Sequence, residues 1–237
     1  MRTIIVGDIH GCIQELTGLL MKLEFNQRED RLVSLGDLMD RGKAAYEVFS
    51  FFRQLKLEMK ERCIIVRGNH EQMLIDIACD RQMKRLWHMN GGRETEKSFF
   101  LHGRKAQTHI PWLEKNTVFY WIGEGYQCVH AGIIEEKPEK NSLDTLLWDR
   151  DAITENCYDK RLTIVGHTPL RDPIYLRGDG RSGEILSYRK RMELPQTGMI
   201  CIDTGCVFGG KLTAMVVEGE EFWLEEEMAF PDINYLV

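Results

Sequence analysis

The sequence lacks three features that would place it in other classes of protein. No apolar run among its 237 residues reaches the roughly 20 residues of a membrane span. The start, Met1-Arg2-Thr3, leads directly into an apolar strand pattern and does not resemble a signal peptide. Positive charge is not in excess either, because the formal net charge is −6, which argues against a broad electrostatic grip on nucleic acid. We therefore expect a cytoplasmic protein that binds neither membranes nor nucleic acid.

Closely paired cysteines are also missing. The seven cysteines are odd in number and include no C-x-x-C pair, which is typical of reduced intracellular thiols rather than of a disulfide framework. Cys12 and Cys206 lie beside motifs described below, and we interpret both as small packing residues. The 43% hydrophobic and 29% charged content is that of a globular chain. We expect one domain over residues 1–237, long enough to bury a substantial core.

Three short apolar segments, each followed by a polar turn and a helical pattern, occupy the first third of the chain. The segments are residues 3–6, 32–35 and 63–66, and the turns read GDIHG, GDLMDRG and GNHE. Strand–turn–helix units in succession imply β-α-β crossovers in a parallel sheet, with all three turns on one edge. Ligands of open α/β sheets bind at such an edge. We therefore expect seven polar side chains to converge there: Asp8, His10, Asp37, Asp40, Arg41, Asn69 and His70.

The chemistry of these turns indicates a metal site. Aspartates and a histidine brought close together would repel or desolvate one another unless a cation neutralises them. Asp, His and Asn side chains supply oxygen and nitrogen ligands suited to Zn, Mn or Fe. Any one turn could instead be an ordinary helix N-cap, where Asp and Asn are also favoured. Three turns of the same build in succession favour the metal interpretation.

The rest of the chain adds two histidines to this set. Residues 80–116 are polar and irregular, and we expect a helical insertion that lies over the site. A hairpin over 117–122 and 126–129 delivers His130, a strand over 162–165 delivers His167, and a strand over 199–202 delivers Asp203-Thr204-Gly205. A helix over 142–150 and closing strands over 212–217 and 221–224 complete the expected elements. Surface or packing roles are expected for the three remaining histidines, which are His88, His102 and His109.

Six motifs, in their order along the chain, resemble those of a known family. GDIHG, GDLMDRG, GNHE, HAG, GHTP and DTG, which run from Gly7 to Gly205, are similar to the motifs of the phosphoprotein phosphatase family of binuclear metallophosphoesterases. VRGNHEQMLID, LLWDR and IDTGCVFGGKLT resemble its small bacterial and phage-lambda-type branch. The resemblance implies an α/β fold of the calcineurin-like sandwich type, with a mixed two-sheet β core flanked by helices.

The resemblance also implies two divalent metal ions. Manganese is the expected metal, and iron or zinc are the alternatives. The ligands would be shared between the ions at Asp37. One ion would be held by Asp8, His10 and Asp37, and the other by Asp37, Asn69, His130 and His167. A hydroxide shared by the two ions would attack phosphorus in line, without a phosphoenzyme.

The remaining matched residues would handle the proton and the phosphate. His70, oriented by Asp40, would protonate the leaving alkoxide. Arg41 and Arg150, together with Asn69, would bind the phosphate oxygens, as forked guanidinium groups do well. Because both arginines have aspartate neighbours in the sequence, simple ion pairs are the alternative for them.

The implied activity is metal-dependent dephosphorylation of serine and threonine residues, and also of tyrosine, in phosphoproteins. Pro169 stands where many related nucleases and cyclic-nucleotide phosphodiesterases carry a second histidine ligand, which favours phosphomonoesterase chemistry. Symmetrical diadenosine tetraphosphate hydrolases are the competing branch, but they usually carry GNHD where this chain has Glu71. A non-catalytic scaffold of the same fold is disfavoured, because every catalytic position is intact.

Two segments outside the motifs, residues 86–116 and 171–197, are expected to form the wall of the substrate site. This wall would decide between phosphoproteins and dinucleotides as substrates. A local positive excess in the second could attract acidic phosphopeptides or a polyphosphate, or could mark an ordinary solvated loop. A dinucleotide pocket needs aromatic faces on which bases stack. Only Trp87, Trp112, Tyr175 and Tyr188 are available in these segments. We therefore expect an open groove that accepts phosphoproteins.

Overall fold

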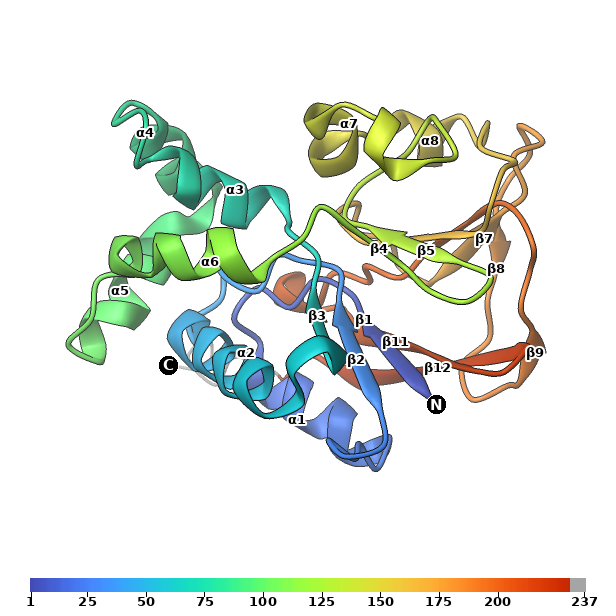
Figure 1. The fold of residues 1–237 in the computed structure, drawn as a ribbon, viewed down its shortest axis with the longest axis horizontal. Coiled ribbons are helices and arrows are strands. Elements are labelled where there is room, and N and C mark those ends of the chain that lie inside the picture. The colour runs from blue at the N-terminus through green and yellow to red at the C-terminus, as the bar shows by residue number, and fades with distance from the viewer. Residues whose placement is uncertain (231–237) are drawn as a thin grey trace.

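The computed structural model describes residues 1–230 and contains two six-stranded sheets with helices on their outer sides (Figure 1). This arrangement confirms the predicted fold class of a mixed two-sheet core flanked by helices. One sheet has the order β3-β2-β1-β11-β12-β9, and the other has the order β4-β5-β6-β10-β7-β8. None of the helices within residues 1–230 is long and apolar enough to cross a membrane.

The first sheet is built on the predicted strand–turn–helix units. Its strands are β1 (Thr3–Val6), β2 (Arg31–Ser34), β3 (Cys63–Ile65), β9 (Met192–Glu193), β11 (Lys211–Glu218) and β12 (Glu221–Met228). β1 pairs in parallel with β2, and β2 with β3, so the predicted parallel crossovers are confirmed. The crossover helices are α1 (Ile13–Lys22) and α2 (Ala45–Met59). β11 then pairs antiparallel with β1 and makes the sheet mixed.

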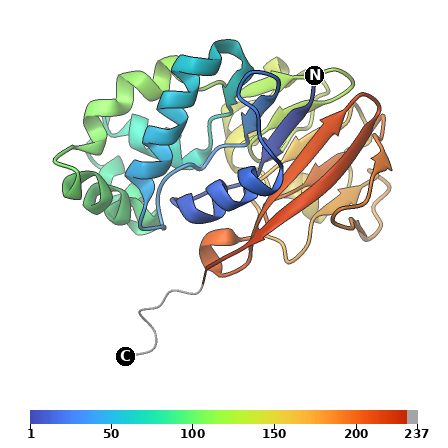
Figure 2. The ribbon, with the colours of Figure 1, turned by 90° about the horizontal axis from the view of Figure 1, so that it is seen from below.

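The alternation of side chains along β1 explains why both faces of this sheet are covered. Ile4 and Val6 belong to the core shared with α1 and α2, whereas Ile5 points into the core between the two sheets. Successive residues of a strand face opposite sides, so an unbroken apolar run such as 3–6 buries both. In Figure 2 the helices lie on one side of β1 and β2, and the strands of the second sheet lie on the other side.

The second sheet is formed by β4 (Tyr120–Ile122), β5 (Gln127–Val129), β6 (Thr163–Val165), β7 (Ile174–Leu176), β8 (Glu184–Ile185) and β10 (Met199–Cys201). β4 and β5 form the predicted hairpin, and β6 pairs in parallel with both β5 and β10. Its outer face packs against α7 (Leu143–Trp148) and α8 (Asp151–Thr154) through a third apolar cluster. Ser142 caps α7 by accepting a hydrogen bond from the Thr145 amide.

Between β3 and β4 the chain is helical and projects beyond the sheets (Figure 1). The elements are α3 (Asn69–Asp76), α4 (Met83–Trp87), a π-helical kink (His88–Gly92), α5 (Arg93–Leu101), a 3-10 turn (Ala106–His109) and α6 (Ile110–Asn116). Short 3-10 turns also occur at Lys60–Arg62, Pro138–Lys140 and Cys206–Phe208. His102 stacks on Tyr46, and His109 packs against Phe49, which are the packing roles expected of them.

The segment 171–197 differs from the sequence prediction. It forms strands rather than a charged wall, and its strand β9 pairs with β12 at Phe222. Phe222 lies opposite Val217 of β11, and Val217 in turn lies opposite Thr3, the first residue of β1. That end of the sheet is remote from the turn that follows β1. The expected positive excess is also neutralised, because Arg177, Arg189 and Arg191 form ion pairs with glutamates, most of which come from β11 and β12. The prediction was wrong because these partners are distant in sequence.

Candidate metal centre

Six turns, those that follow β1, β2, β3, β5, β6 and β10, meet at one edge of the two sheets. They bring together eight side chains that are almost completely buried: Asp8, His10, Asp37, Asn69, His70, His130, His167 and Asp203. Seven of these were expected to converge from the sequence. Asp203 belongs to the DTG motif, to which sequence reasoning assigned no individual role.

The backbone of these turns is strained. Among residues 1–230, nine non-glycine residues have positive φ angles, and five of them belong to the turns: His10, Asp37, Asp40, Arg41 and His167. A non-glycine residue in the left-handed region costs of the order of 1 kcal/mol or more and persists only where its surroundings hold it. Such residues concentrate at functional sites, and their clustering here is evidence for one independent of any motif.

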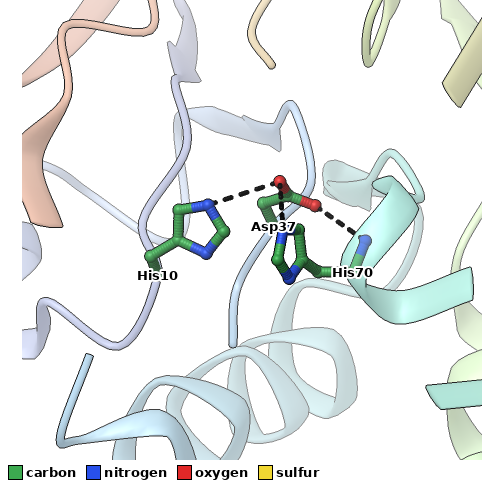
Figure 3. A group of neighbouring side chains, drawn as sticks. All are labelled: His10, Asp37 and His70. Atoms are coloured by element: carbon green, nitrogen blue, oxygen red, sulfur yellow. Dashed lines mark hydrogen bonds and ion pairs between the residues drawn. The ribbon is translucent and has the colours of Figure 1, made fainter. Parts of the chain in front are cut away.

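His10, Asp37 and His70 form one compact group, whose side chains point toward one another in Figure 3. His10 Nδ1 donates to the Met39 carbonyl at 2.7 Å, so its unprotonated Nε2 faces Asp37 Oδ2 at 3.4 Å. Burial lowers the pKa of His10 to about 3, which keeps the ring neutral. A neutral imidazole held by a backbone carbonyl and aimed at a carboxylate is prepared to bind a metal.

A second compact group shares Asp37 with the first and contains His130 and His167. His130 Nδ1 donates to the Leu35 carbonyl at 2.7 Å, which leaves the lone pair of Nε2 facing Asp37 Oδ2 at 3.6 Å and Asn69 Oδ1 at 2.9 Å. His167 Nδ1 lies 3.1 Å from the same Asn69 oxygen. Burial lowers the pKa of both histidines, that of His167 to about 3. Asp37 Oδ2, Asn69 Oδ1 and His167 Nδ1 therefore converge around His130 Nε2.

Asp8 lies beside these groups but makes a different contact. Both of its carboxylate oxygens accept the backbone N–H of His167 at 3.1 Å. Among the described residues, the compact group around His10 contains His70 and not Asp8. Burial, together with repulsion from Asp203 and Asp37, raises the pKa of Asp8 well above its usual range. Burial likewise raises the pKa of Asp203 to about 6.

These residues fit a divalent cation. Buried carboxylates raise one another's pKa and are relieved by positive charge, and the ring nitrogens of His130 and His167 both lie within 3.1 Å of the Asn69 side-chain oxygen. Their oxygen and nitrogen donors, with no thiolate among them, suit Mn, Fe or Zn. Because Asp37 takes part in both compact groups, its carboxylate could serve as a ligand to both of two neighbouring ions. The clusters can therefore bind divalent metal.

His70 and Asp40 form a buried pair next to this centre. His70 Nδ1 donates to Asp40 Oδ2 at 2.7 Å, and its buried Nε2 has no hydrogen-bond partner among the described residues. Asp40 also accepts from Trp87 Nε1 at 2.8 Å and from Thr95 Oγ1 at 2.6 Å. Burial lowers the pKa of His70, but Asp37 and Asp40 outweigh it, so that the pKa is raised overall. The ring can therefore hold a proton on Nε2 and donate it.

Glu71 has a role that the sequence reasoning missed. Its carboxylate accepts three backbone hydrogen bonds at 2.9 Å, from the amides of Asp37, Leu38 and Gly68. It thereby ties the turn after β2 to the start of α3 and holds Asp37 in place. The available signal was its position three residues after Gly68, the spacing of a capping box. Trp87 and Thr95, which hold Asp40, gave no comparable signal.

The two arginines lie at the rim. The Arg41 guanidinium contacts His10 Nε2 and lies 5.4 Å from the Phe208 ring. Arg150 is exposed, and its Nη1 donates to Thr168 Oγ1 at 3.4 Å. Within the described chain, neither arginine forms an ion pair with a carboxylate, so the alternative of a neighbouring ion pair receives no support. Both guanidinium groups are able to bind an anion.

Comparison with known proteins agrees with this geometry. Residues 1–215 match the family model described as calcineurin-like phosphoesterase. Serine/threonine-protein phosphatase 1 of Salmonella typhimurium is 31% identical over 222 residues, which cover 88% of each chain. The symmetrical bis(5'-nucleosyl)-tetraphosphatase of Azotobacter vinelandii is 26% identical over 272 residues, covering 91% of this chain and 93% of the other.

Two solved structures share the fold. A putative diadenosine tetraphosphatase aligns with a TM-score of 0.61 and 20% identity, covering 97% of this chain and 94% of the other. The cold-active protein-tyrosine phosphatase of a Shewanella species aligns with a TM-score of 0.67 and 16% identity, covering 97% and 80%. At these identities the structures support the fold and carry no information on the substrate.

Proposed function

The chain belongs to the calcineurin-like phosphoesterase family and is a hydrolase of the metallophosphoesterase superfamily, and on this premise we propose that it is a binuclear phosphoprotein phosphatase. Its substrates would be phosphoserine and phosphothreonine residues, and also phosphotyrosine. The observation that carries the proposal is the Asp37 carboxylate, shared by two groups of ligand-type side chains and flanked by the buried His70–Asp40 pair.

The proposed ligand sets agree with the second compact group and differ from the first, which contains His70 and not Asp8. One ion would be held by Asp8, His10 and Asp37, and the other by Asp37, Asn69, His130 and His167. Two divalent ions that share a carboxylate supply Lewis acidity and activate a water molecule at neutral pH. Manganese, iron and zinc all suit these ligands. The backbone carbonyls that hold His10 and His130 keep their Nε2 atoms directed inward without further ordering.

The other side chains would handle the proton and the phosphate. His70 Nε2 would donate its proton to the departing alkoxide oxygen, while Asp40 keeps the ring oriented and favours its protonated form. Arg41 and Arg150 would bind the non-bridging oxygens of the phosphate and balance its charge, with Asn69 beside them. These steps need no covalent intermediate on the protein.

The environment of the aromatic residues supports an open phosphoprotein site. Trp87 is fully buried against Asp40, and Trp112 is half-buried and packs edge-to-face against Phe49. Tyr175 is buried, and the Tyr188 hydroxyl is engaged with Thr213. The aromatic residues on which the dinucleotide alternative depended are thus used for packing.

One observation favours the second candidate, hydrolysis of symmetrical dinucleoside tetraphosphates. Trp148 and Phe208 expose rings close to the centre, next to His167 and Arg41 respectively. Two exposed rings near the centre could stack the two bases of a dinucleotide. The similarity to proteins named as tetraphosphatases keeps this candidate open.

A direct comparison tests the proposal. We expect kcat/KM on phosphoserine and phosphothreonine peptides to exceed that on diadenosine tetraphosphate, measured with the same Mn²⁺-loaded preparation. A preference for the dinucleotide of a hundredfold, about 2.7 kcal/mol of transition-state binding, would overturn the phosphoprotein assignment. Trp148→Ala refines the result, because it should impair the dinucleotide far more than a phosphopeptide if the ring stacks a base. The cytoplasmic location remains a prediction, which cell fractionation would test.

A further inference from the structure

A cleft of about 790 Å³ lies on the helical segment between β3 and β4, outside the metal centre. It is formed by the end of α3, α4, α5 and the 3-10 turn that follows. Five basic side chains line it: Arg81, Lys84, Lys97, Arg104 and Lys105. We call this feature the basic cleft. Its helices stand away from the two sheets in Figure 1.

The positive charge of the basic cleft is not balanced within the described chain. Glu96 is the one acidic residue of its lining, and it is already paired with Lys84 at 2.8 Å and with His88 at 2.9 Å. The other four basic residues have no carboxylate within ion-pairing distance among residues 1–230. Elsewhere, by contrast, the arginines of 171–197 are mostly paired, and the whole chain carries a net charge of −6. An unpaired basic cluster on an acidic protein attracts an anion.

The cleft also exposes apolar surface. The Phe100 side chain is 75% exposed, and Ile77 and Ala106 complete the apolar part of the lining. A cleft of about 790 Å³ that combines this apolar surface with several basic side chains is large enough to hold a ligand.

The combination of features selects among anionic ligands. A long nucleic acid would need a broad basic surface, which a chain of net charge −6 does not favour. A short acidic peptide with an aromatic or aliphatic side chain would place its carboxylates against the lysines and arginines and its apolar side chain against Phe100. Such a peptide would contact only the cleft, so the negative charge on the rest of the protein would weaken its binding little.

The cleft shares its helices with the catalytic pair but faces away from it. On α4 and α5, Trp87 and Thr95 are buried and hold Asp40, whereas Lys84, Lys97 and Phe100 line the cleft. A ligand in the cleft would therefore touch neither His70 nor Asp40. It would hold a protein substrate through a surface that takes no part in the reaction.

We propose that the basic cleft is a docking site for an acidic, aromatic-containing segment of a partner protein, separate from the residue that is dephosphorylated. That the partner is a substrate rests on the proposed phosphoprotein phosphatase activity. The binding of the acidic segment does not rest on it and can be measured without turnover.

Binding is tested with the full-length protein and a fluorescein-labelled peptide that contains one phenylalanine flanked by glutamates. We expect saturable anisotropy that weakens as salt is raised, because the charges are exposed to solvent. Lys97→Glu combined with Arg104→Glu should raise Kd at least tenfold. Phe100→Ser should raise Kd several-fold even at high salt. A peptide with lysines in place of the glutamates should not bind.

The matched control is Lys137→Glu combined with Lys190→Glu, which makes the same change in net charge at exposed positions outside the cleft. It should leave Kd within twofold of the wild type. Equal weakening by both double variants would overturn the proposal, because the attraction would then be a property of overall charge. Tighter binding of polyphosphate or single-stranded DNA than of the peptide, lost in the same cleft variant, would also overturn it.

A kinetic experiment separates docking from catalysis. With p-nitrophenyl phosphate, the cleft variant should match the wild type in kcat and KM. With a phosphopeptide joined to the acidic segment, it should raise KM about tenfold at unchanged kcat. If the protein binds the acidic peptide through the cleft but dephosphorylates no phosphopeptide, the proposed function fails while the docking site stands. An unchanged KM on the joined substrate would refute docking of substrates.

Discussion

His70 Nδ1 donates to Asp40 Oδ2 at 2.7 Å, and this hydrogen bond directs the opposite ring nitrogen, Nε2, toward the shared carboxylate of Asp37 at 3.9 Å. The pair is buried, and two further donors, Trp87 and Thr95, hold Asp40. One nitrogen of His70 is therefore bonded to Asp40, and the other is available for the proposed acid role. The first two predictions follow from this division.

Replacement of His70 by asparagine should remove the proton donor and keep the metal centre. A general acid contributes roughly 10²–10⁴-fold, so His70→Asn should lower kcat on phosphoserine peptides by that range. The loss should be much smaller on p-nitrophenyl phosphate, whose leaving group needs little protonation. Steady-state kinetics on both substrates, with metal analysis of the same samples, provide the measurement. Equal losses on the two substrates would be incompatible with an acid role.

Replacement of Asp40 by asparagine should change the pH profile. Burial lowers the pKa of His70, and Asp37 and Asp40 raise it by more. The acid is active while protonated, so activity falls as pH rises through this pKa. Asp40→Asn removes one of the raising charges and should move the alkaline limb of kcat to lower pH. An alkaline limb that stays in place would show that another group controls it.

Loss of the Asp37 charge should affect both ions. A chelator should abolish activity and Mn²⁺ should restore it in the wild type. Asp37→Asn should reduce the metal content at both positions, because the carboxylate belongs to both compact groups. Metal analysis by mass spectrometry is the measurement, and Asp40→Asn, which changes no proposed ligand, is the control. Full metal occupancy in Asp37→Asn would contradict the shared role.

Glu71→Gln should weaken the support of Asp37. The side chain accepts three backbone N–H groups in a buried place, and an amide would leave at least one of them facing another donor. An unsatisfied buried donor costs about 1–3 kcal/mol, and Tm falls by roughly 2–4 °C per kcal/mol for a chain of this size. Calorimetry should show this loss, together with weaker metal binding. Glu61→Gln, at an exposed position, should show neither.

Arg150→Ala should impair phosphate binding and leave folding intact. The guanidinium is exposed and has only a long hydrogen bond to Thr168. Removal of a charged donor to phosphate should raise KM for phosphate esters about tenfold and weaken inhibition by inorganic phosphate equally. Arg171→Ala, another exposed arginine, serves as the control. A large fall in Tm with an unchanged KM would assign Arg150 to structure instead.

Local patterns in the sequence were sufficient to predict the scaffold of the centre. Apolar runs such as 3–6 specify buried strands, and the glycines and polar residues directly after them specify turns at strand ends. Parallel crossovers then place those turns on one edge, which is where Asp37, His130 and His167 meet. The residues concerned and their order needed no knowledge of long-range contacts.

The partners of these residues were decided only by the tertiary structure. The contact of Trp87 with Asp40 spans 47 residues, and the ion pair of Arg189 with Glu225 joins β12 to a segment that the sequence suggested was free and positive. Periodicity reports whether a side chain is buried, because burial depends on its own strand or helix. It does not report which distant side chain meets it, because that depends on how separate elements pack.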